Sequence, residues 1–342
     1  MIQTADLERA IALALASSYV KGEKPVSLLI VSDRPEAGKS DVLSKFSKSS
    51  KIAYLTDATA YALWRDFHQV IARGEVRHML IPEFLLPLSR SSDTVKSFIT
   101  TLQALIEEGF AEIHTGFLKP IKFQSAVSVG VLACMPRPAF LKYKPEWELS
   151  GFLSRFMVVT YSYDAKTVEE IFQSIINRAY LTEVDITLDF PEESMDITIP
   201  ETVAQKCLKL ALYVTETARS KGKAYGFREL KNIQRMVAAN VILDNMKHRE
   251  SVRTIADLYD FAMVMRLRYL FTEDFNPLQG STDWASLENK IHHVRQGLLL
   301  LPEDIKSVIS AISGMFPDDD GNEDESILAE IEHIAQIIEA KE

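Results

Sequence analysis

Short apolar runs alternate with longer segments of helical period through the first half of the chain. Where consecutive positions are apolar, a strand covered on both faces is predicted, as in a parallel sheet. Five segments fit this pattern: VSLLIV from Val26, IAYLTD from Ile52, RHMLIPEF from Arg77, AVSVGVLACMP from Ala126 and RFMVVTYSY from Arg155. Amphipathic helices are predicted between them, for example from Thr4 to about Tyr19 and in DTVKSFITTLQALIEEG from Asp93. The alternation predicts an α/β fold, with a mostly parallel sheet between helices.

The second half of the chain changes to a mainly helical pattern. Residues 166–272 turn helical after the irregular stretch VDITLDFPEESMDITIPET, and residues 283–342 are helical again around the acidic run DDDGNEDES. We therefore predict an α/β core at 1–165, a helical part at 166–272 and a helical C-terminal extension with an acidic linker at 283–342.

Composition is that of an ordinary globular protein, with 47% hydrophobic and 25% charged residues among 342. The net charge of −10 is uneven, because residues 318–342 hold ten acids against Lys341 alone. The rest of the chain is nearly neutral, so a local basic surface for nucleic acid remains compatible with it. Two cysteines give no disulfide framework, and no signal peptide or membrane-spanning run is found. A cytoplasmic protein without a membrane partner is predicted.

The stretch from Ser27 to Phe46, SLLIVSDRPEAGKSDVLSKF, has the order strand, turn, Gly-Lys-Ser and helix. In such a loop backbone N–H groups face a phosphate, Lys39 adds a positive charge, and the Ser40 hydroxyl holds Mg²⁺. We predict ATP or ADP with Mg²⁺ at Gly38, Lys39 and Ser40. The alternative is an ordinary strand-to-helix turn.

Two acids depart from the usual loop. Asp33 stands where glycine would tolerate unusual backbone angles. Glu36 places a carboxylate near the phosphates, which it repels unless it points away. Nucleotide binding weaker than that of an intact loop is therefore predicted.

The order of motifs resembles that of an AAA+ ATPase, and more narrowly the motor core of the minichromosome maintenance (MCM) helicases. DRPEAGKS keeps Pro35 and the Lys-Ser pair of that family's Gly-Asp-Pro-Gly-x-Ala-Lys-Ser. LIPEF resembles its Asp-Glu-Phe motif, and the stretch ALIEEGF to CMPRP resembles its long helix, hairpin and strand ending in Ala-Ala-Asn-Pro. The resemblance spans about Val26 to Leu270. It implies a P-loop AAA+ core followed by a helical lid, and it concerns the motor core alone.

The resemblance assigns catalytic roles that this sequence keeps only in part. Pro82 stands where the family has the acid of the metal shell, and Glu83 matches the acid that orients water. If the register slips by one, Glu83 takes the metal role and Phe84 replaces the second acid. Met135 stands in place of the polar sensor asparagine. Slow or absent hydrolysis is predicted, and the alternative for Glu83 is a surface acid at a strand end.

Two arginines match the family better. GFLSRF resembles the motif whose arginine, here Arg155, reaches the ATP of a neighbouring subunit. Arg228 in AYGFRELKNIQRMVAANVI matches the lid arginine that touches the γ-phosphate, whereas Arg235 is interpreted as structural. A site made by two chains implies a homo-oligomer, either a ring or a filament. The alternative for Arg155 is a surface arginine in a salt bridge.

DNA contact is a separate prediction. HTGFLKPIKF, from His114 to Phe123, is interpreted as a hairpin with Lys119 and Lys122 near its tip. In the resembling family, hairpins in this region carry lysines to the phosphate backbone, although two loop lysines are also typical of a solvated surface. No zinc-ligand spacing is found in the sequence, since the two cysteines are isolated and His292-His293 lie far from both.

Two classes of function remain open. The first is an ATP-dependent, MCM-like protein that forms an oligomer and acts on DNA with impaired hydrolysis. The second is a non-enzymatic assembly or scaffold module that keeps the AAA+ fold and binds a protein partner.

Overall fold

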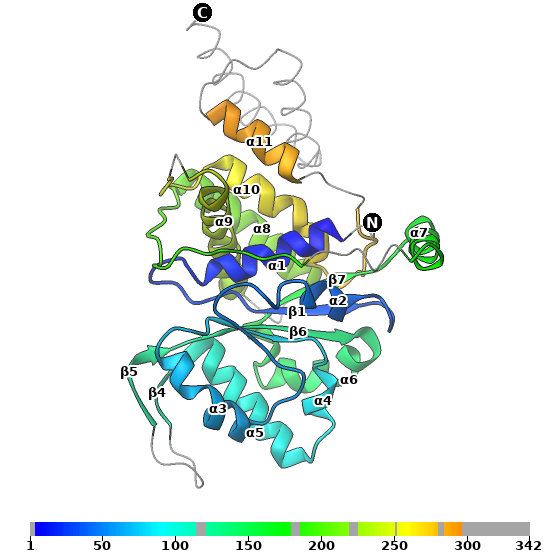
Figure 1. The fold of residues 1–342 in the computed structure, drawn as a ribbon, viewed down its shortest axis with the longest axis vertical. Coiled ribbons are helices and arrows are strands. Elements are labelled where there is room, and N and C mark those ends of the chain that lie inside the picture. The colour runs from blue at the N-terminus through cyan, green and yellow to red at the C-terminus, as the bar shows by residue number, and fades with distance from the viewer. Residues whose placement is uncertain are drawn as a thin grey trace, which may run out of the picture.

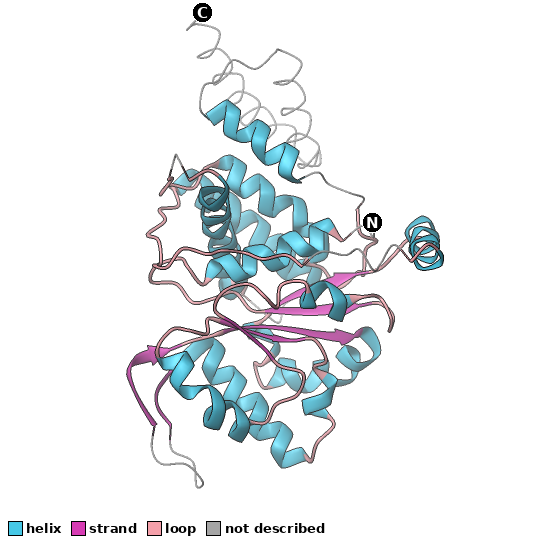
Figure 2. Ribbon diagram, viewed as in Figure 1, coloured by secondary structure: helices cyan, strands magenta, loops and turns pink. Residues whose placement is uncertain are grey.

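A five-stranded parallel sheet lies at the centre of the molecule, between two layers of helices (Figures 1 and 2). The computed structural model describes residues 4–113, 121–178, 185–218, 225–249, 252–279 and 284–295. The strand order is β2-β3-β6-β1-β7. The strands are β1 (Leu28–Ser32), β2 (Ile52–Tyr54), β3 (His78–Ile81), β6 (Gly130–Pro136) and β7 (Met157–Tyr161). The predicted α/β fold with a parallel sheet flanked by helices is confirmed.

Alternate residues of each strand face two separate hydrophobic clusters, which explains why the strands read as continuous apolar runs. Along β1, Leu28 and Ile30 belong to the first cluster, and Leu29 and Val31 to the second. The register aligns Leu28 with Leu132 of β6 and with Met157 of β7. All residues of β1 are buried.

The second cluster packs the sheet against one helical layer, below the sheet in Figure 1. This layer contains α3 (Ala60–Ala72), α4 (Leu85–Leu88), α5 (Ser92–Gln103), the π-turn Ala104–Glu108 and α6 (Arg137–Leu149). Phe84 lies in its centre, with ring centroids 5.9 Å from Trp147 and 6.3 Å from Phe98. The predicted helical face of α5 is this buried face, with Phe98 and Leu102 among its residues.

The first cluster joins the other face of the sheet to the second helical layer. This layer contains α1 (Ala5–Ser17), α8 (Glu201–Ala218), α9 (Phe227–Lys247), α10 (Leu258–Met265) and the 3₁₀ turn Arg266–Leu270. Residues from both sides of the predicted boundary at 165/166 share this one cluster, which also includes Trp284 and Ile291 of α11 (Trp284–Arg295). The helical part therefore packs directly on the sheet and on α1.

α2 (Lys39–Ser44) follows β1 after the loop 33–38 and contributes Val42 and Leu43 to the first cluster. Two elements project from the layered body. α7 (Ala165–Ile176) projects sideways from the end of β7 (Figure 1). The hairpin of β4 (Phe110–Ile113) and β5 (Ile121–Val127) is antiparallel and projects from the opposite side of the molecule.

Candidate functional site

The loop after β1 lies at a switch point of the sheet. From β1 the chain continues to β2 on one side, while β7, the last strand, pairs with β1 on the other side. In open α/β sheets, ligands bind beyond the carboxyl ends of the strands at such a point. Residues 33–38, which connect β1 to α2, occupy this position.

Two tyrosines hold the loop from β7. The hydroxyls of Tyr161 and Tyr163 both donate hydrogen bonds to the Ala37 carbonyl, at 2.7 and 2.9 Å. Burial raises the pKa of Tyr161 well above its usual value, so its hydroxyl remains a neutral donor. The sequence interpretation did not include either tyrosine, although their position at the carboxyl end of an apolar run next to β1 was a usable signal.

The loop contains two residues in the left-handed backbone region. Gly38 has φ 66°, and α2 begins immediately after it. Glu36 has φ 64°, whereas Asp33 has no positive φ and donates its backbone N–H to the Tyr161 carbonyl at 3.1 Å. The unfavourable backbone conformation that was expected at Asp33 is thus found at Glu36, where the resembling family has glycine. Glu36 and the neighbouring Pro35 are both exposed.

Ser40 on α2 meets the turn after β3. Its Oγ donates to Glu83 Oε1 at 2.7 Å and lies 3.2 Å from the Pro82 carbonyl oxygen. Glu83 is exposed, and Phe84 after it is fully buried. Glu83 is therefore the acid that faces the Ser40 hydroxyl, whereas the next side chain, Phe84, points into the core.

Near the end of β6, the side chain that faces the loop is a thiol, whereas the resembling family has the amide of its sensor asparagine in this region. Cys134 belongs to the first cluster, and its Sγ lies 3.7 Å from the Lys39 carbonyl oxygen. Burial raises the pKa of this thiol, so it is a neutral neighbour of the loop. Met135 is fully buried in the second cluster, on the opposite face of the sheet. Its side chain is therefore turned away from the loop.

A cavity of about 560 Å³ adjoins the loop on the side of α7. Its lining combines backbone of the loop with apolar side chains that could cover a flat aromatic ring. The lining residues include Ala37, Gly38, Asp41, Tyr163, Ile171 and Ile175.

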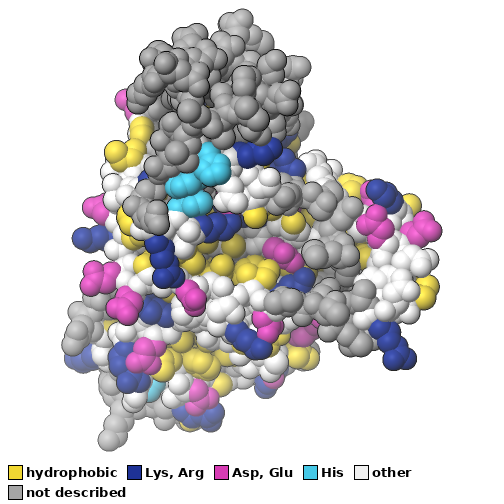
Figure 3. Space-filling view, turned by 45° about the horizontal axis from the view of Figure 1, so that its top comes forward, with side chains coloured by type: hydrophobic (Ala, Val, Ile, Leu, Met, Phe, Trp, Pro, Cys, Tyr) yellow, Lys and Arg dark blue, Asp and Glu magenta, His cyan; other side chains and the backbone are white. Residues whose placement is uncertain are grey.

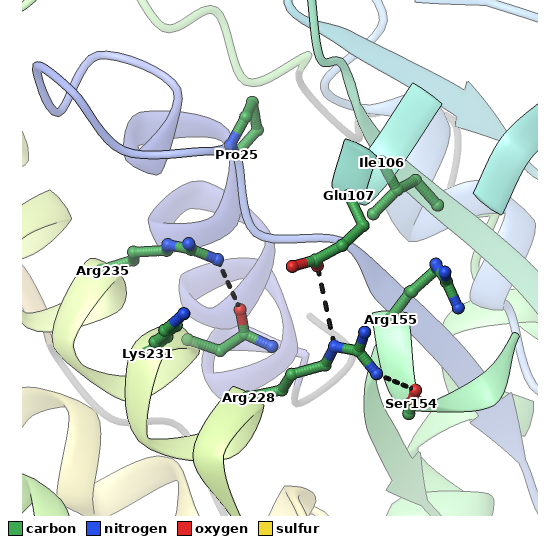
Figure 4. Close-up of a pocket in the computed structure, with 9 residues that line it drawn as sticks. Pro25, Ile106, Glu107, Ser154, Arg155, Arg228, Lys231 and Arg235 are labelled. Atoms are coloured by element: carbon green, nitrogen blue, oxygen red, sulfur yellow. Dashed lines mark hydrogen bonds and ion pairs between the residues drawn. The ribbon is translucent and has the colours of Figure 1, made fainter. Parts of the chain in front are cut away.

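The two predicted arginines come together in one basic pocket (Figure 4). Arg228, in the first turn of α9, donates from Nη1 to Ser154 Oγ at 2.5 Å, and its Nε lies 3.8 Å from Glu107. Arg155 donates to the Gly151 carbonyl at 2.6 Å and to Glu108 at 2.5 Å. Lys231 and Arg235 complete the cationic lining.

This pocket lies at the amino ends of the strands, whereas the loop lies beyond their carboxyl ends. Arg155 precedes β7, and Pro25, which also lines the pocket, precedes β1. A strand of five residues spans about 16 Å. Arg155 and Arg228 are therefore brought together with each other and not with Lys39 of the same chain. Arg235 contacts Glu23 at 2.8 Å and Asn232 at 3.2 Å.

Of the two lysines predicted near the tip of the hairpin, the structure describes only Lys122. Lys119 lies outside the described residues. Lys122 is exposed on β5, opposite Glu112, and the two side chains form an ion pair at 3.3 Å.

No family model and no curated protein matches the chain. Among solved structures, the chain is distantly similar to a full-length MCM homolog from Methanopyrus kandleri, with a TM-score of 0.42 and 11% identity. The similarity covers 79% of this chain and 56% of that one, so the chain spans little more than half of its length. Within the described residues, none of the helices has the length and apolar character needed to cross a membrane.

Proposed function

We propose that the protein is an AAA+-like module that binds ATP or ADP with Mg²⁺ at residues 33–40. The observation that carries this proposal is the 2.7 Å hydrogen bond between Ser40 Oγ and Glu83 Oε1. In P-loop proteins, the hydroxyl of this motif and an acid after a neighbouring strand together hold Mg²⁺ against the phosphates. One hydroxyl and one carboxylate suit an ion that keeps several waters. Gly38 and Lys39 would contact the phosphates.

Slow hydrolysis forms part of the proposal. Glu83 is hydrogen-bonded to Ser40, Phe84 is fully buried, and Met135 is turned to the other face of the sheet. The two positions that would orient the attacking water thus carry no polar group. Loss of one positioned group typically costs about a hundredfold to a thousandfold in rate. Turnover is therefore expected well below the usual value of about 10 per second.

The proposal also assigns Arg155 and Arg228 to the nucleotide of a neighbouring copy, in a ring or filament. Guanidinium groups stabilise charge on a transferring phosphoryl group when they are supplied in trans. The proposal is supported by their position: both arginines line one pocket at the strand ends opposite the loop, away from Lys39 of the same chain.

Action on DNA is proposed through the hairpin β4–β5. The strands β4 and β5 project from the body (Figure 1). Lys122 on β5, together with Lys119 from the segment between the two strands in the sequence, would contact backbone phosphates. The exposed ion pair between Lys122 and Glu112 would hinder DNA contact only slightly, because surface ion pairs contribute about 1 kcal/mol or less.

Substitution of Lys39 tests the nucleotide site. Lys39→Ala should weaken the binding of a fluorescent ATP analogue at least about tenfold, because a charge-assisted contact to phosphate is lost. Lys48→Ala is the matched control: Lys48 follows α2 closely but is exposed and paired with Asp185 at 2.5 Å. Equilibrium titration measures both. Equal affinity of Lys39→Ala and wild type would refute the site.

Steady-state ATPase measurements distinguish the two classes of function. Slow turnover, little stimulated by single-stranded DNA, is expected for the wild type. If nucleotide binds but turnover is undetectable and DNA does not bind, the alternative of a scaffold for a protein partner is supported. Robust turnover would contradict the impaired site and show that a further carboxylate, for example Glu36 or Asp57, serves the metal.

A further inference from the structure

Three potential metal ligands meet between α9 and α11, far along the chain from one another. Asp244 lies in the last turn of α9, and His248 is the residue that caps this helix at its C-terminus. The backbone N–H of His248 donates to the Asp244 carbonyl at 2.9 Å, so the two residues are neighbours one turn apart. His292 approaches them from α11. One ligand atom of each residue lies within 4.8 Å of the others. Figure 3 shows histidine side chains gathered at one place on this face of the molecule.

The position of α11 is fixed by packing. Trp284 and Ile291 are buried in the first cluster, and the indole N–H of Trp284 donates to Asp6 of α1 at 3.0 Å. Glu288 is 4% exposed and forms an ion pair with Arg9 at 2.6 Å. These contacts hold α11 in place, so His292, one turn after Glu288, has a fixed position next to the C-terminal end of α9.

The Asp244 carboxylate is oriented with its two oxygens in different directions. Arg253 binds Oδ2, with Nη2 at 2.9 Å and Nε at 3.1 Å. Oδ1 lies 3.8 Å from His248 Nε2. That Nε2 atom is buried and makes no hydrogen bond. Metal-ligating carboxylates are commonly held by such an outer partner, so Arg253 fits the role of an orienting group.

The two imidazole rings are stacked face to face. Their centroids lie 3.6 Å apart, and the planes differ by 5°. The stacking holds the two rings side by side, with the carboxylate of Asp244 next to them. Around a tetrahedral ion with bonds near 2.1 Å, ligand atoms lie about 3.4 Å apart. The three atoms already lie within 4.8 Å of one another, so metal binding would require the rings to splay and the atoms to approach by about an ångström.

We propose that Asp244, His248 and His292 bind a divalent ion of the zinc type, with water in the fourth position. Two imidazoles and one carboxylate are a donor set that suits Zn²⁺, and its three protein ligands leave one position open. The ion would strap α11 to α9 and add its binding free energy to the stability of the helical layer. This site is independent of the nucleotide loop.

Metal titration of the full chain tests the proposal. After chelator treatment and dialysis, Zn²⁺ is titrated by calorimetry, and Co²⁺ is followed by its visible absorption, which reports tetrahedral coordination. One ion per chain is expected. His248→Ala and His292→Ala should each lower the affinity at least about tenfold, since even loss of an outer-shell partner costs about 10–100-fold.

His293→Ala is the matched control, because His293 is exposed and its ring centroid lies 6.3 Å from that of His292. Its affinity for Zn²⁺ should equal that of the wild type. Zn²⁺ should also raise the melting temperature of the wild type and of His293→Ala, but not of His248→Ala or His292→Ala. No saturable binding to the wild type, or equal losses in all three variants, would overturn the proposal.

Discussion

At the scale of single residues, Glu36 combines two unfavourable features in the candidate loop. Its φ of 64° is a conformation that side chains with a Cβ adopt at a cost of about 1 kcal/mol or more. Glu36 also lines the cavity beside the loop, where its negative charge would repel the phosphates of the proposed nucleotide. Such local strain is typical of a site whose backbone shape is imposed by function.

Two substitutions of Glu36 separate these effects. Glu36→Gly should raise the free energy of unfolding by about 1 kcal/mol, because glycine relieves the backbone cost, and should also tighten nucleotide binding. Glu36→Gln removes the charge but keeps the strained backbone, so only the affinity should rise. Denaturant unfolding and analogue titration measure the two quantities. If Glu36→Gln gains as much stability as Glu36→Gly, the strain assignment is wrong.

Single residues also show which features could be predicted from the sequence and which could not. The run of apolar residues before DRPEAGKS predicted β1 correctly, because every residue of that strand is covered on both faces. The hydrogen bond between Glu83 and Ser40 could not be predicted, since the side-chain directions in the turn after β3 depend on where α2 lies. The cluster of Asp244 and His292 was missed for a similar reason. Only the packing of α11 brings these distant positions together.

At the scale of elements, His78 links β3 to its neighbours. Its Nε2 lies 3.2 Å from the Val26 carbonyl oxygen, just before β1. On β6, a Cβ at Gly130 would lie 2.2 Å from the same nitrogen, so glycine alone leaves room for the ring. Burial lowers the pKa of His78 to about 4, with Arg77 adding to the shift. The junction of three elements therefore requires a neutral histidine.

This junction predicts how stability depends on pH. The unfolded chain takes up a proton at His78 below about pH 6.5, whereas the folded chain does so only near pH 4. The stability is therefore complete above pH 6.5 and decreases as the pH falls towards 4, by about 3 kcal/mol at most. His78→Gln should show a smaller loss over this range in urea unfolding. His68→Gln on α3 is the control, and a wild-type profile in His78→Gln would contradict the prediction.

The core that the sheet shares with the helical part could not be predicted from the sequence pattern. Helical period reveals the apolar faces of α8 and α9, but it does not show what covers them. In the structure α1 and the sheet cover them, and Arg9 of α1 hydrogen-bonds to Asn240 of α9. The first turn of α9, with Arg228, is therefore fixed relative to β1 and to the pocket of Arg155.

At the scale of the whole molecule, the sheet separates two sets of groups that one phosphoryl-transfer site would need. Ser40, Lys39 and Glu83 lie beyond the carboxyl ends of the strands, and Arg155 and Arg228 lie at the amino ends. A rigid sheet with both faces packed cannot bring the two sets together within one chain. In the proposed assembly, head-to-tail contact would bring the carboxyl edge of one copy against the amino edge of the next. Such a heterologous interface would close into a ring or extend as a filament.

Mixing two defective variants tests this arrangement. Lys39→Ala copies should bind nucleotide poorly but still supply Arg155, whereas Arg155→Ala copies should bind nucleotide and release it rapidly. In an equal mixture, about half of the intact loops would face a neighbour that carries Arg155, if copies assemble at random. About half of the bound fluorescent nucleotide should then be released slowly, as in the wild type, when chased with excess ATP in a stopped-flow experiment. If Arg155 acted within its own chain, the mixture would show only the rapid phase of Arg155→Ala. Arg73→Ala, which changes an exposed arginine paired with Glu75 on the far layer, should leave the slow release of the wild type unchanged.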